Sequence, residues 1–495
     1  MSLDLEMWEK RARAAKPLCQ MFINGAFVDA ASGETFEDIS PRGQRLIANV
    51  ASGDSEDVNR AVSAATKSFE AGVWSAMNPR DKKAIMLKWA DLIRAHQEEL
   101  GLLETMDVGK PISDSLNVDV MGAARTIQWY GEALDKTYDE IAPAPRNALA
   151  MITREPLGVI GAIVPWNYPM IISAWKIAPA LAMGNSVVLK PAEQSPLSAL
   201  LLARLASEAG MPDGVFNVVT GLGPKAGQAL ARHNSVAKVA FTGSGPTGRK
   251  MLQYAAESNL KQVALELGGK SAQVVLDDVI DLDAAASAIA WGIFYNAGQT
   301  CHASSRLIVQ GGVKEELFSR ITKFLETFTV GDPLNPKTLM GPLVSVQQRD
   351  RVNSYLALVD QEGGRFVFGG SQATGDDCMI APTLIDGVKH ESRLAQEEIF
   401  GPVLVALEAK DEAEAIAMAN GTEYALAASV WTGNIGRAHR VARQLRAGTV
   451  WVNTFDMSDI ITPFGGFRGS GSGRDRSLHA LDGYSALKTT WIDLS

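Results

Sequence analysis

Hydrophobic and polar residues follow two different periods along this chain. From about Ser55 to Trp129, apolar and charged residues recur at helical spacing, most clearly in DKKAIMLKWADLIRAHQEEL. After residue 156, short apolar runs such as GVIGAIV, SVVLK and VAKVAFTG alternate with helical stretches. This alternation predicts a parallel sheet covered by helices. The pattern resumes with SAQVVL, a long helical stretch and SRLIVQ, so we expect a second α/β unit.

Three other segments predict smaller β elements. In FINGAFV (22–28), Asn24 and Gly25 form a dipeptide that favours a two-residue hairpin turn. IAPAPRNALA (141–150) ends the helical region and predicts a boundary or a protruding element. The final GYSALKTTWIDL alternates like an exposed strand, which needs a pairing partner that a second subunit could supply.

Residues 156–175 carry no charge over a length that could span a bilayer. Pro165, Asn167 and Pro169 interrupt this segment, and a helix there would lose backbone hydrogen bonds that lipid cannot replace. We therefore expect a buried strand, a loop and a helix, and no membrane span.

Composition narrows the class of protein. The 495 residues predict about three domains, and 46% hydrophobic with 21% charged residues is ordinary for a folded globular chain. A net charge of -9 without a block of Lys and Arg argues against a nucleic-acid partner. Cys19, Cys301 and Cys378 are too few for a disulfide framework or a zinc site, so we expect no metal and a reducing compartment. The acidic start MSLDLEMWEK is unlike an export signal, which favours the cytoplasm.

GSGPTG (243–248) is a candidate phosphate-binding turn, because it matches GxGxxG between a predicted strand and a predicted helix. Glycines let the backbone approach a phosphate, and the helix amino terminus supplies N–H donors. A tight turn without a ligand explains the hexapeptide equally well. The acid of the usual fingerprint, about 20 residues further on, would be Glu266, whose position suits another role. We therefore do not expect the ordinary dinucleotide layout.

Lys190 and Glu193, in KPAE, follow the strand SVVLK. At the carboxyl end of a parallel strand, this pair could bind a ribose diol. The carboxylate would repel a 2′-phosphate, which favours NAD over NADP. A solvated loop pair is the alternative.

NAGQTCH (296–302) places a cysteine beside a histidine. A thiolate at Cys301 could attack a carbonyl carbon, and an inert buried cysteine is the alternative. Adjacent side chains of an extended chain point to opposite faces, so we expect His302 to be a neighbour and not the partner of the thiol. Catalytic Cys and His normally come from distant segments.

Two other polar residues suit a site of this kind. Glu266 closes a predicted strand before the glycines of LELGGK and could act as a base, unless it is a surface glutamate. Asn167 is the polar exception in an apolar run, and its amide could donate to an oxyanion or form a turn.

Together these motifs resemble the aldehyde dehydrogenase superfamily nearly end to end. The motifs, in the family's order, are IVPWNYP, KPAE, FTGS, LELGGK, GQTC, EEIFGPV and PFGGFRGSGSGRD. The chain is most similar to γ-glutamyl-γ-aminobutyraldehyde dehydrogenases and related aminoaldehyde enzymes. That similarity lies in DKKAIMLKWADLIRAHQEELGLLETMDVGKPI, the AGQTC region and GRDRSLHALDGYSALKTTWI.

The resemblance implies an α/β fold with a Rossmann-like but atypical cofactor domain, a second α/β catalytic domain and a small β oligomerisation element. Residues 1–137 and 157–268 would form the NAD-binding domain and 269–468 the catalytic domain. Residues 138–156 and 469–495 would form the oligomerisation element.

The resemblance also implies roles for individual residues. Cys301 would be the nucleophile and Glu266 the general base for deacylation. Asn167 and the backbone N–H of Cys301 would form the oxyanion hole, and Lys176 would assist a proton relay. Lys190 and Glu193 would hold the adenine ribose. The other expected cofactor contacts are Ser244 at the pyrophosphate, Glu398 at the nicotinamide ribose, Phe400 against that end, and Trp166, Gly223 and Gly243.

Substrate contacts are expected from aromatic residues in the segments that line the family's tunnel and from two acids that could meet a cationic end group. They are Trp129, Tyr168, Trp175, Trp291, Asp119 and Asp459. Aromatic faces and carboxylates both attract ammonium and guanidinium groups. Packed aromatics and solvated acids are the alternative.

The sequence departs from the commoner family pattern at three places. Gly245 and Pro246 stand where bulkier residues are usual, which concerns cofactor geometry. His302 follows the nucleophile. Asp475 stands where glutamate is frequent, which concerns a proton relay through that acid.

We therefore expect NAD-dependent oxidation of an ω-amino, ω-guanidino or γ-glutamylamino aldehyde, in polyamine catabolism. We expect a cytoplasmic dimer or homotetramer that assembles through the carboxyl-terminal strand. A broad-specificity or semialdehyde dehydrogenase of the same fold is the alternative. An enzyme that transfers the thioester to coenzyme A is less favoured, because Glu266 is retained for water activation. A cofactor-free thiol hydrolase and a catalytically silent protein are the rivals of another class.

Overall fold

The structure is a computed structural model that describes residues 4–371 and 378–495. Its largest sheet has eight strands in the order β19-β11-β10-β7-β8-β9-β1-β2. From β11 to β9 the strands run parallel, and β19 and the β1–β2 hairpin join antiparallel. The strands are β1 (Met21–Ile23), β2 (Ala26–Val28), β7 (Val159–Ile163), β8 (Ser186–Lys190), β9 (Phe216–Val218), β10 (Val236–Thr242), β11 (Gln262–Glu266) and β19 (Gly471–Ser472).

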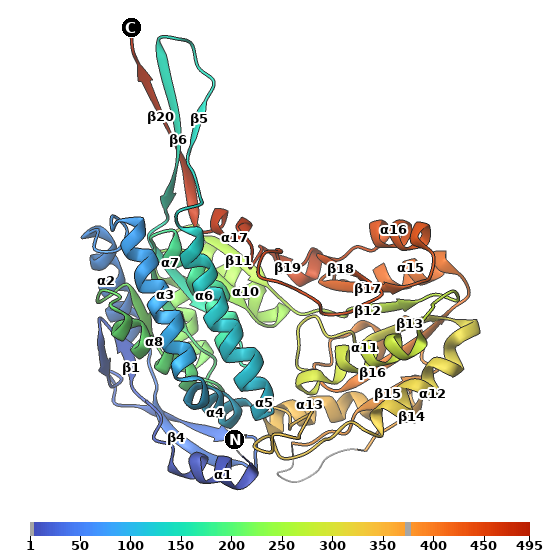
Figure 1. Ribbon diagram of the computed structural model, residues 1–495. Helices are drawn as coiled ribbons and strands as arrows, with labels where there is room; N and C mark the ends of the chain where they lie inside the picture. The colour runs from blue at the N-terminus through green and yellow to red at the C-terminus, as the bar shows by residue number, and fades with distance from the viewer. Residues whose placement is uncertain (1–3, 372–377) are drawn as a thin grey trace.

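Helices cover both faces of this sheet because successive strand residues point to opposite sides. Val187 and Leu189 of β8 join a core with α3, α6, α7 and α8, whereas Val188 joins a second core with α2, α9 and α10 (Figure 1). The helices are α2 (Ser55–Glu70), α3 (Pro79–Ala95), α6 (Met121–Ala133), α7 (Pro169–Ala182), α8 (Leu197–Ala209), α9 (Gln228–Arg232) and α10 (Gly245–Ala256).

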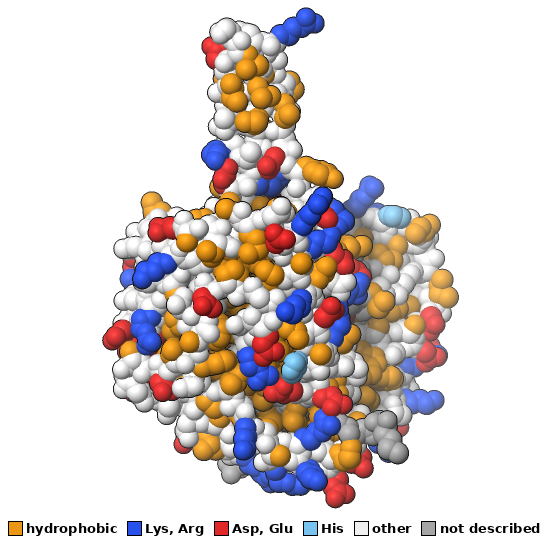
Figure 2. All heavy atoms as spheres, turned by 60° about the vertical axis from the view of Figure 1, so that its left-hand side comes forward, with side chains coloured by type: hydrophobic (Ala, Val, Ile, Leu, Met, Phe, Trp, Pro, Cys, Tyr) orange, Lys and Arg blue, Asp and Glu red, His pale blue; other side chains and the backbone are white. Residues whose placement is uncertain are grey.

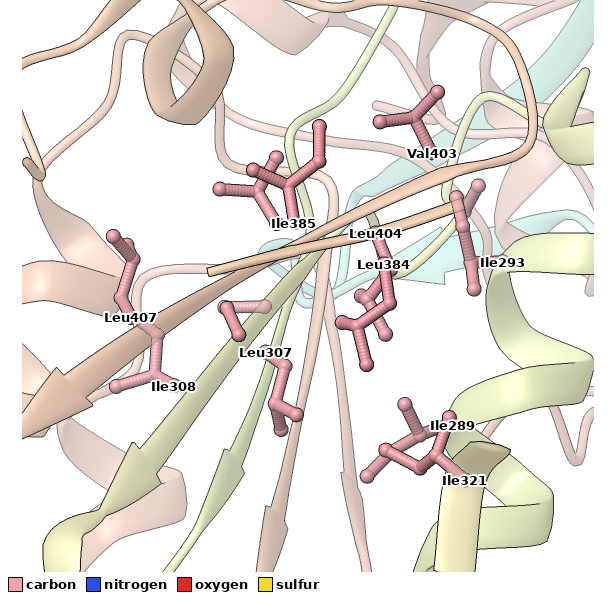
Figure 3. Close-up of a cluster of buried hydrophobic side chains, with 14 of the residues drawn as sticks. Ile289, Ile293, Leu307, Ile308, Ile321, Leu384, Ile385, Val403, Leu404 and Leu407 are labelled. Carbon is pink, nitrogen blue, oxygen red and sulfur yellow. The ribbon is translucent and has the colours of Figure 1, made fainter. Parts of the chain in front are cut away.

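The second large sheet has seven strands in the order β14-β15-β16-β13-β12-β17-β18 and is parallel except at β14. Its strands are β12 (Ala272–Val275), β13 (Arg306–Gln310), β14 (Arg365–Phe368), β15 (Thr383–Asp386), β16 (Val403–Ala409), β17 (Ala427–Trp431) and β18 (Thr449–Val452). Around it lie α11 (Leu282–Phe294), α12 (Lys314–Leu325), α13 (Val346–Leu356), α15 (Glu412–Asn420) and α16 (Ile435–Gln444). Ile289 and Ile293 of α11 belong to the same buried core as Leu307 of β13 and Leu404 of β16 (Figure 3).

A three-stranded antiparallel sheet projects from the body of the molecule (Figure 1). It comprises β5 (Glu140–Ala142), β6 (Ala148–Pro156) and β20 (Ser485–Asp493). The carboxyl-terminal strand therefore pairs with β6 of its own chain, from Ser485 opposite Pro156 to Asp493 opposite Ala148. This projecting sheet carries hydrophobic side chains on its surface (Figure 2). The exposed ones are Tyr138, Ile141, Leu487, Trp491, Ile492 and Leu494.

Several short elements complete the chain. They are α1 (Leu5–Ala14), the β3 (Thr35–Ser40) and β4 (Arg45–Ala51) pair, α4 (Gln97–Val108), α5 (Ile112–Asp114), α14 (Arg393–Gln396) and α17 (His479–Asp482). Helical segments with other hydrogen-bond patterns are η1 (Ser115–Val120), η2 (Gly223–Gly227), η3 (Tyr295–Gly298), η4 (Gly311–Val313) and η5 (Arg468–Ser470).

The local sequence predictions are confirmed. Asn24 and Gly25, with φ of 53° and 79°, form the turn between β1 and β2. Residues 156–175 form the end of β6, then β7, a loop and the start of α7, as expected. In the described part of the chain, none of the helices combines the length and the apolar character that crossing a membrane requires.

The expected division into domains stays a prediction. The eight-stranded sheet takes its strands from residues 21–28, 159–266 and 471–472, and the seven-stranded sheet from 272–452. The expected oligomerisation segment 469–495 divides between two sheets, because β19 pairs with β11 and β20 pairs with β6.

Candidate active site

The chain reaches Cys301 through a loop that few sequences could form. Helix α11 ends at Phe294, and Asn296 and Ala297 then adopt positive φ values of 50° and 53°. At Gly298, with φ of 71°, a Cβ would lie 2.1 Å from the carbonyl oxygen of Gly401. Only glycine fits there. The loop delivers Cys301 in a turn, where the residue is half-buried.

Asn167 lies in the loop between β7 and α7 and is bound to the cysteine loop. Its Nδ2 donates to the carbonyl oxygen of Gln299 at 2.8 Å, and Asn296 Nδ2 donates to the carbonyl oxygen of Asn167 at 3.1 Å. The asparagine is buried. These contacts hold its amide beside the turn that carries Cys301.

The paired glycines of LELGGK make room for two other groups. A Cβ at Gly268 would lie 2.1 Å from Oε2 of Glu398, and a Cβ at Gly269 would lie 2.6 Å from the carbonyl oxygen of Cys301. The N–H of Gly269 donates to Oε1 of Glu398 at 3.0 Å. Burial raises the pKa of Glu398 to about 7.

A cavity of about 520 Å³, here called the α10 cavity, lies at the start of helix α10. Cys301 and six of the expected residues line it: Trp166, Asn167, Gly243, Ser244, Glu398 and Phe400. The Ser244 side chain makes no capping bond to the helix, so N–H groups of the first turn remain available to a ligand. Lys190, Glu193 and Gly223 lie outside this cavity.

Two features shape the α10 cavity further. The rings of Trp166 and Phe400 meet edge to face, with centroids 5.4 Å apart. Phe400 has a φ of 62°, which is strained for an aromatic residue and which we associate with the placement of its ring.

Near the carboxyl end of β8, Lys190 Nζ lies 3.2 Å from Glu193 Oε2. Burial lowers the pKa of Lys190, and the Glu193 carboxylate opposes that change.

A second cavity of about 560 Å³, here called the aromatic cavity, lies on the other side of the cysteine. Cys301 lines it together with Tyr168, Trp175, Trp451 and Phe464. The Tyr168 hydroxyl and the Thr300 hydroxyl are 2.7 Å apart, which ties the α7 end of the wall to the cysteine loop.

A third cavity of about 780 Å³, here called the outer cavity, continues outward from the aromatic cavity. The two share Trp175 and Arg476, and the outer one is also lined by Trp129 and Asp459. Asp459 is ion-paired with Arg125, and both side chains are exposed to solvent. The charged residues that line the outer cavity are therefore Arg94, Arg125, Arg476, Glu132 and Asp459.

Two residues expected at the substrate line none of these cavities. The carboxylate of Asp119 is fully buried and accepts a hydrogen bond from Lys110 Nζ at 2.7 Å, which neutralises its charge. Trp291 packs on the outer side of α11, with ring centroids 5.1 Å from Phe328. Helical spacing could not distinguish the inner from the outer face of that helix.

Glu266, at the end of β11, faces a buried charged group and lines neither cavity next to Cys301. Lys176 Nζ donates to Asp475 Oδ2 at 2.6 Å, and both side chains are buried. Burial raises the pKa of Glu266 well above its ordinary value, and the nearby Asp475 carboxylate raises it further. Asp475 therefore reaches Lys176 in spite of its shorter side chain.

The expectation that His302 turns away from the thiol is wrong. Residues 301 and 302 lie in a turn, not in extended chain, so their side chains can approach one another. Cys301 Sγ lies 3.8 Å from His302 Nδ1, and His302 Nε2 lies 2.8 Å from Asp456 Oδ1. Burial by itself would lower the pKa of His302, but the Asp456 carboxylate outweighs it and raises that pKa to about 10.

Sequence reasoning missed many other lining residues, four of which are polar or charged groups close to the predicted site. Gln348 and Arg351 of α13 line the α10 cavity, where Gln348 Nε2 donates to the Phe400 carbonyl at 2.7 Å and Arg351 donates to the Glu398 carbonyl at 2.6 Å. Asp456 and Arg476 line the aromatic cavity. Gln348, Arg351 and Asp456 belong to none of the motifs quoted above, so only their tertiary placement reveals them. Arg476 lies within GRDRSLHALDG, a motif that gave no indication of its place in the cavity.

Comparison with known proteins identifies relatives over nearly the whole chain. Residues 27–490 match the profile described as the aldehyde dehydrogenase family. The NADP/NAD-dependent aldehyde dehydrogenase PuuC of Escherichia coli K12 is 49% identical over 490 residues, 99% of each chain.

Two solved structures have a TM-score of 0.98 with this chain and cover all of it, each over its own full length. One is an indole-3-acetaldehyde dehydrogenase in complex with NAD+, 50% identical. The other is the γ-glutamyl-γ-aminobutyraldehyde dehydrogenase of Burkholderia cenocepacia J2315, 49% identical. Both large α/β units and the projecting sheet are thus part of a known fold.

Proposed function

This chain belongs to the aldehyde dehydrogenase family, and we propose that it oxidises an aldehyde with a nitrogen-bearing tail through a covalent intermediate on Cys301. The protein is an oxidoreductase that converts an aldehyde to its carboxylic acid with NAD. The cavities around Cys301 support a role for each residue of the site and a class of substrate.

One observation carries the proposed role of Cys301. The cysteine lines both the α10 cavity and the aromatic cavity, so one residue borders both spaces. A cofactor in the first and an aldehyde in the second would both reach the same atom. An inert structural cysteine would not need access from two sides.

The first half-reaction forms a bond to Cys301. Its thiolate adds to the carbonyl carbon, the C=O electron pair moves to oxygen, and a thiohemiacetal results. Asn167 Nδ2 and the N–H of Cys301 would stabilise the negative oxygen. NAD, when bound, supplies the acceptor for the hydride that leaves this carbon, and a thioester remains on the sulfur.

The second half-reaction releases the acid. Glu266 would take a proton from a water molecule, which attacks the thioester and returns the Cys301 thiolate as the carboxylate leaves. Burial and the Asp475 carboxylate raise the pKa of Glu266, which makes its carboxylate a stronger base than an ordinary glutamate. The buried pair of Lys176 and Asp475 would pass the proton onward.

The residues around the α10 cavity fit a dinucleotide. The uncapped start of α10 offers N–H donors to a pyrophosphate, and Ser244 stands at that point. Glu398 would accept from the nicotinamide ribose, with Phe400 against that end. Lys190 and Glu193 would hold the adenine ribose, with the carboxylate favouring NAD over NADP.

The substrate class rests on the walls of the aromatic cavity and on the relatives' names. Tyr168 and Trp175 line this cavity and offer aromatic rings against which the tail of such an aldehyde could pack. One relative is named for γ-glutamyl-γ-aminobutyraldehyde and another for indole-3-acetaldehyde, and both names denote nitrogen-bearing aldehydes. Such a substrate would place the protein in polyamine breakdown.

A semialdehyde is the second candidate. Arg125 and Arg476 line the outer cavity and could meet a carboxylate at the far end of the substrate. A γ-glutamylamino aldehyde, which carries both charges in its tail, satisfies the arginines and Asp459 together.

We also propose a cytoplasmic homotetramer assembled through the projecting sheet. The exposed apolar residues of β20, Leu487 and Trp491 among them, support an interface there. Three cysteines, too few for a disulfide framework, support a reducing compartment. Light scattering of the chain with and without Trp491→Glu would test the assembly.

A substrate panel tests the function. Purified protein is mixed with NAD or NADP and with aminoaldehydes, γ-glutamylamino aldehydes, semialdehydes and alkyl aldehydes of equal length, and NADH absorbance is followed. We expect the highest kcat/KM for nitrogen-bearing aldehydes with NAD. Equal values across the panel would favour the broad-specificity alternative, and ester hydrolysis without any NADH would favour the thiol hydrolase.

A further inference from the structure

We propose that His302, held by Asp456, is the cation that keeps Cys301 in its thiolate form before the aldehyde arrives. This inference rests on the proposed role of Cys301 as the nucleophile. It assigns the proton of the thiol to a residue of the same loop, whereas Glu266 keeps the later proton transfer from water.

The three side chains form a continuous line. His302 Nδ1 lies 3.8 Å from Cys301 Sγ, within reach of a hydrogen bond to sulfur, and Nε2 lies 2.8 Å from Asp456 Oδ1. With Nε2 directed to a carboxylate, only Nδ1 can serve the thiol. A residue next to the nucleophile in sequence thus holds the position that a distant histidine usually takes in thiol enzymes.

The imidazole is held in place by aromatic rings. Its centroid lies 5.5 Å from Phe464, 6.2 Å from Trp451 and 6.3 Å from Phe455. The His302 side chain is 14% exposed. Water therefore screens the charge on this ring poorly, and its attraction for a thiolate is stronger than at the surface.

The segment that supplies Asp456 is also held. Asp456 has a φ of 60°, a conformation that aspartate tolerates better than most residues. Trp451 Nε1 donates to the Met457 carbonyl oxygen at 2.8 Å, which closes the segment around the aspartate. The conformation of this loop thus directs the Asp456 carboxylate toward His302.

The other titratable groups of the aromatic cavity do not supply the cation and the carboxylate that His302 and Asp456 provide beside Cys301. Among the described residues that line the aromatic cavity, Asp456 is the one carboxylate. Arg476 Cζ lies 5.4 Å from the Trp175 ring centroid, and its guanidinium donates to the Asp459 carbonyl. Tyr168 and Tyr295 also line the cavity, but burial raises the pKa of each phenol well above its ordinary value, so both stay neutral.

The proton balance is simple. The thiol proton of Cys301 passes to Nδ1 of His302, which leaves a thiolate and an imidazolium. The sulfur lone pair then forms the S–C bond, and the carbonyl electron pair moves to oxygen. When the thioester is hydrolysed, the same imidazolium meets the departing thiolate. The raised pKa of His302 agrees with a ring that stays protonated at neutral pH.

Alkylation of the thiol tests this without any aldehyde. Wild-type protein and His302→Asn are treated with iodoacetamide from pH 5 to pH 9, and the Cys301 peptide is followed by mass spectrometry, which separates it from Cys19 and Cys378. We expect the pH at which the alkylation rate of Cys301 is half-maximal to rise by about one unit in His302→Asn. Alkylation at pH 6 should then slow about tenfold. Asp456→Asn should shift the midpoint in the same direction by less.

His439→Asn is the matched control, because this histidine is exposed on α16 and lines none of the three cavities. It should leave the profile unchanged. NAD affinity reports whether each variant is folded, and if His302→Asn does not fold, Asp456→Asn decides by the same profile. A profile in the folded variants that superimposes on the wild type overturns the inference. Failure to oxidise any aldehyde would contradict the proposed function alone, since the alkylation profile would still be measured.

Discussion

The two cavities that meet at Cys301 are built in different ways. The α10 cavity combines strand ends, glycines and an uncapped helix start, which offer backbone N–H groups, with side chains such as Trp166, Glu398 and Phe400. The aromatic cavity is formed by side chains from α7, β18 and the loop after it. Backbone surfaces suit a ligand that never changes, such as a cofactor, whereas side chains can be exchanged without altering the fold.

The electrostatics differ in the same sense. In the α10 cavity, burial raises the pKa of Glu398, whereas the N–H of Gly269 favours its charged form. The other charged residues along that cavity are Arg249, Arg351, Glu397 and Glu423. In the aromatic cavity, an imidazole, a carboxylate and a guanidinium stand within one space. Substitutions in the α10 cavity should therefore alter cofactor binding, and substitutions in the aromatic cavity should alter the reaction of the aldehyde.

The largest effect is expected where the two sides meet. Cys301→Ala should abolish NADH formation with every aldehyde, because the proposed covalent bond to the aldehyde forms at the sulfur that this substitution removes. It should still bind NAD, since the α10 cavity keeps its other walls. Steady-state absorbance and NAD titration by tryptophan fluorescence measure the two properties. Retained turnover would contradict the role of the thiol.

Gly268→Ala should affect cofactor binding in the α10 cavity without affecting aldehyde binding in the aromatic cavity. The added Cβ would lie 2.1 Å from Glu398 Oε2 and displace that carboxylate. We expect KM for NAD to rise roughly tenfold to a hundredfold, because that factor corresponds to the loss of about one hydrogen bond to a charged group. KM for the aldehyde should stay almost unchanged. Gly312→Ala is the control, because nothing lies within 4 Å of its Cβ position. An equal rise in both KM values would contradict the separation.

Glu398 should make cofactor binding depend on pH. Burial raises its pKa to about 7, so its carboxyl is neutral below that pH and charged above it. We expect KM for NAD to fall about fivefold between pH 6 and pH 8, because the carboxylate accepts hydrogen bonds more strongly. Glu398→Gln should lack this dependence.

The same substitution has a signature in stability. Between pH 4.5, the ordinary pKa of glutamate, and about pH 7, the Glu398 carboxyl is protonated in the folded protein and ionised in the unfolded chain. Wild type should therefore lose stability relative to Glu398→Gln as pH rises through that window. Thermal melts of both proteins at pH 5 and pH 8 measure this, and a constant difference in Tm would contradict the raised pKa.

The smallest effect is expected at the outer cavity. Asp459 and Arg125 form an exposed ion pair, which contributes at most about 1 kcal/mol. Arg125→Ala should free the carboxylate and raise the preference for cationic over neutral aldehydes about twofold to fivefold. Asp459→Ala should lower it by a similar factor. If both variants change kcat/KM in the same direction, the pair acts on structure and not on the substrate's charge.

Local sequence was a good guide where the backbone makes the structure. The Asn24-Gly25 turn, the parallel strands and the strand-to-helix turn at GSGPTG were all predicted, since each depends on the conformation of a few neighbouring residues. Gly268 was predicted only as a flexible neighbour of Glu266. Its contact with Glu398, 130 positions later, required the tertiary structure.

Side-chain direction was predicted poorly. Asp119 was expected at the substrate but lies buried on Lys110, and Trp291 was expected there but packs outside α11. His302 was expected to turn away from Cys301, although a turn brings the two together. In each case the residue type was suitable for the role, and the local backbone or a distant partner decided otherwise.

The sequence by itself determined the family, the two α/β units and the motifs that bring Cys301, Asn167 and Glu266 into one molecule, because these follow from backbone periodicity and short fixed spacings. Only the tertiary structure decided which charges face the thiol. Asp456 lies 154 residues from His302, and no local pattern links them. Electrostatic interactions depend on distance in space and on burial, and both are properties of the folded chain.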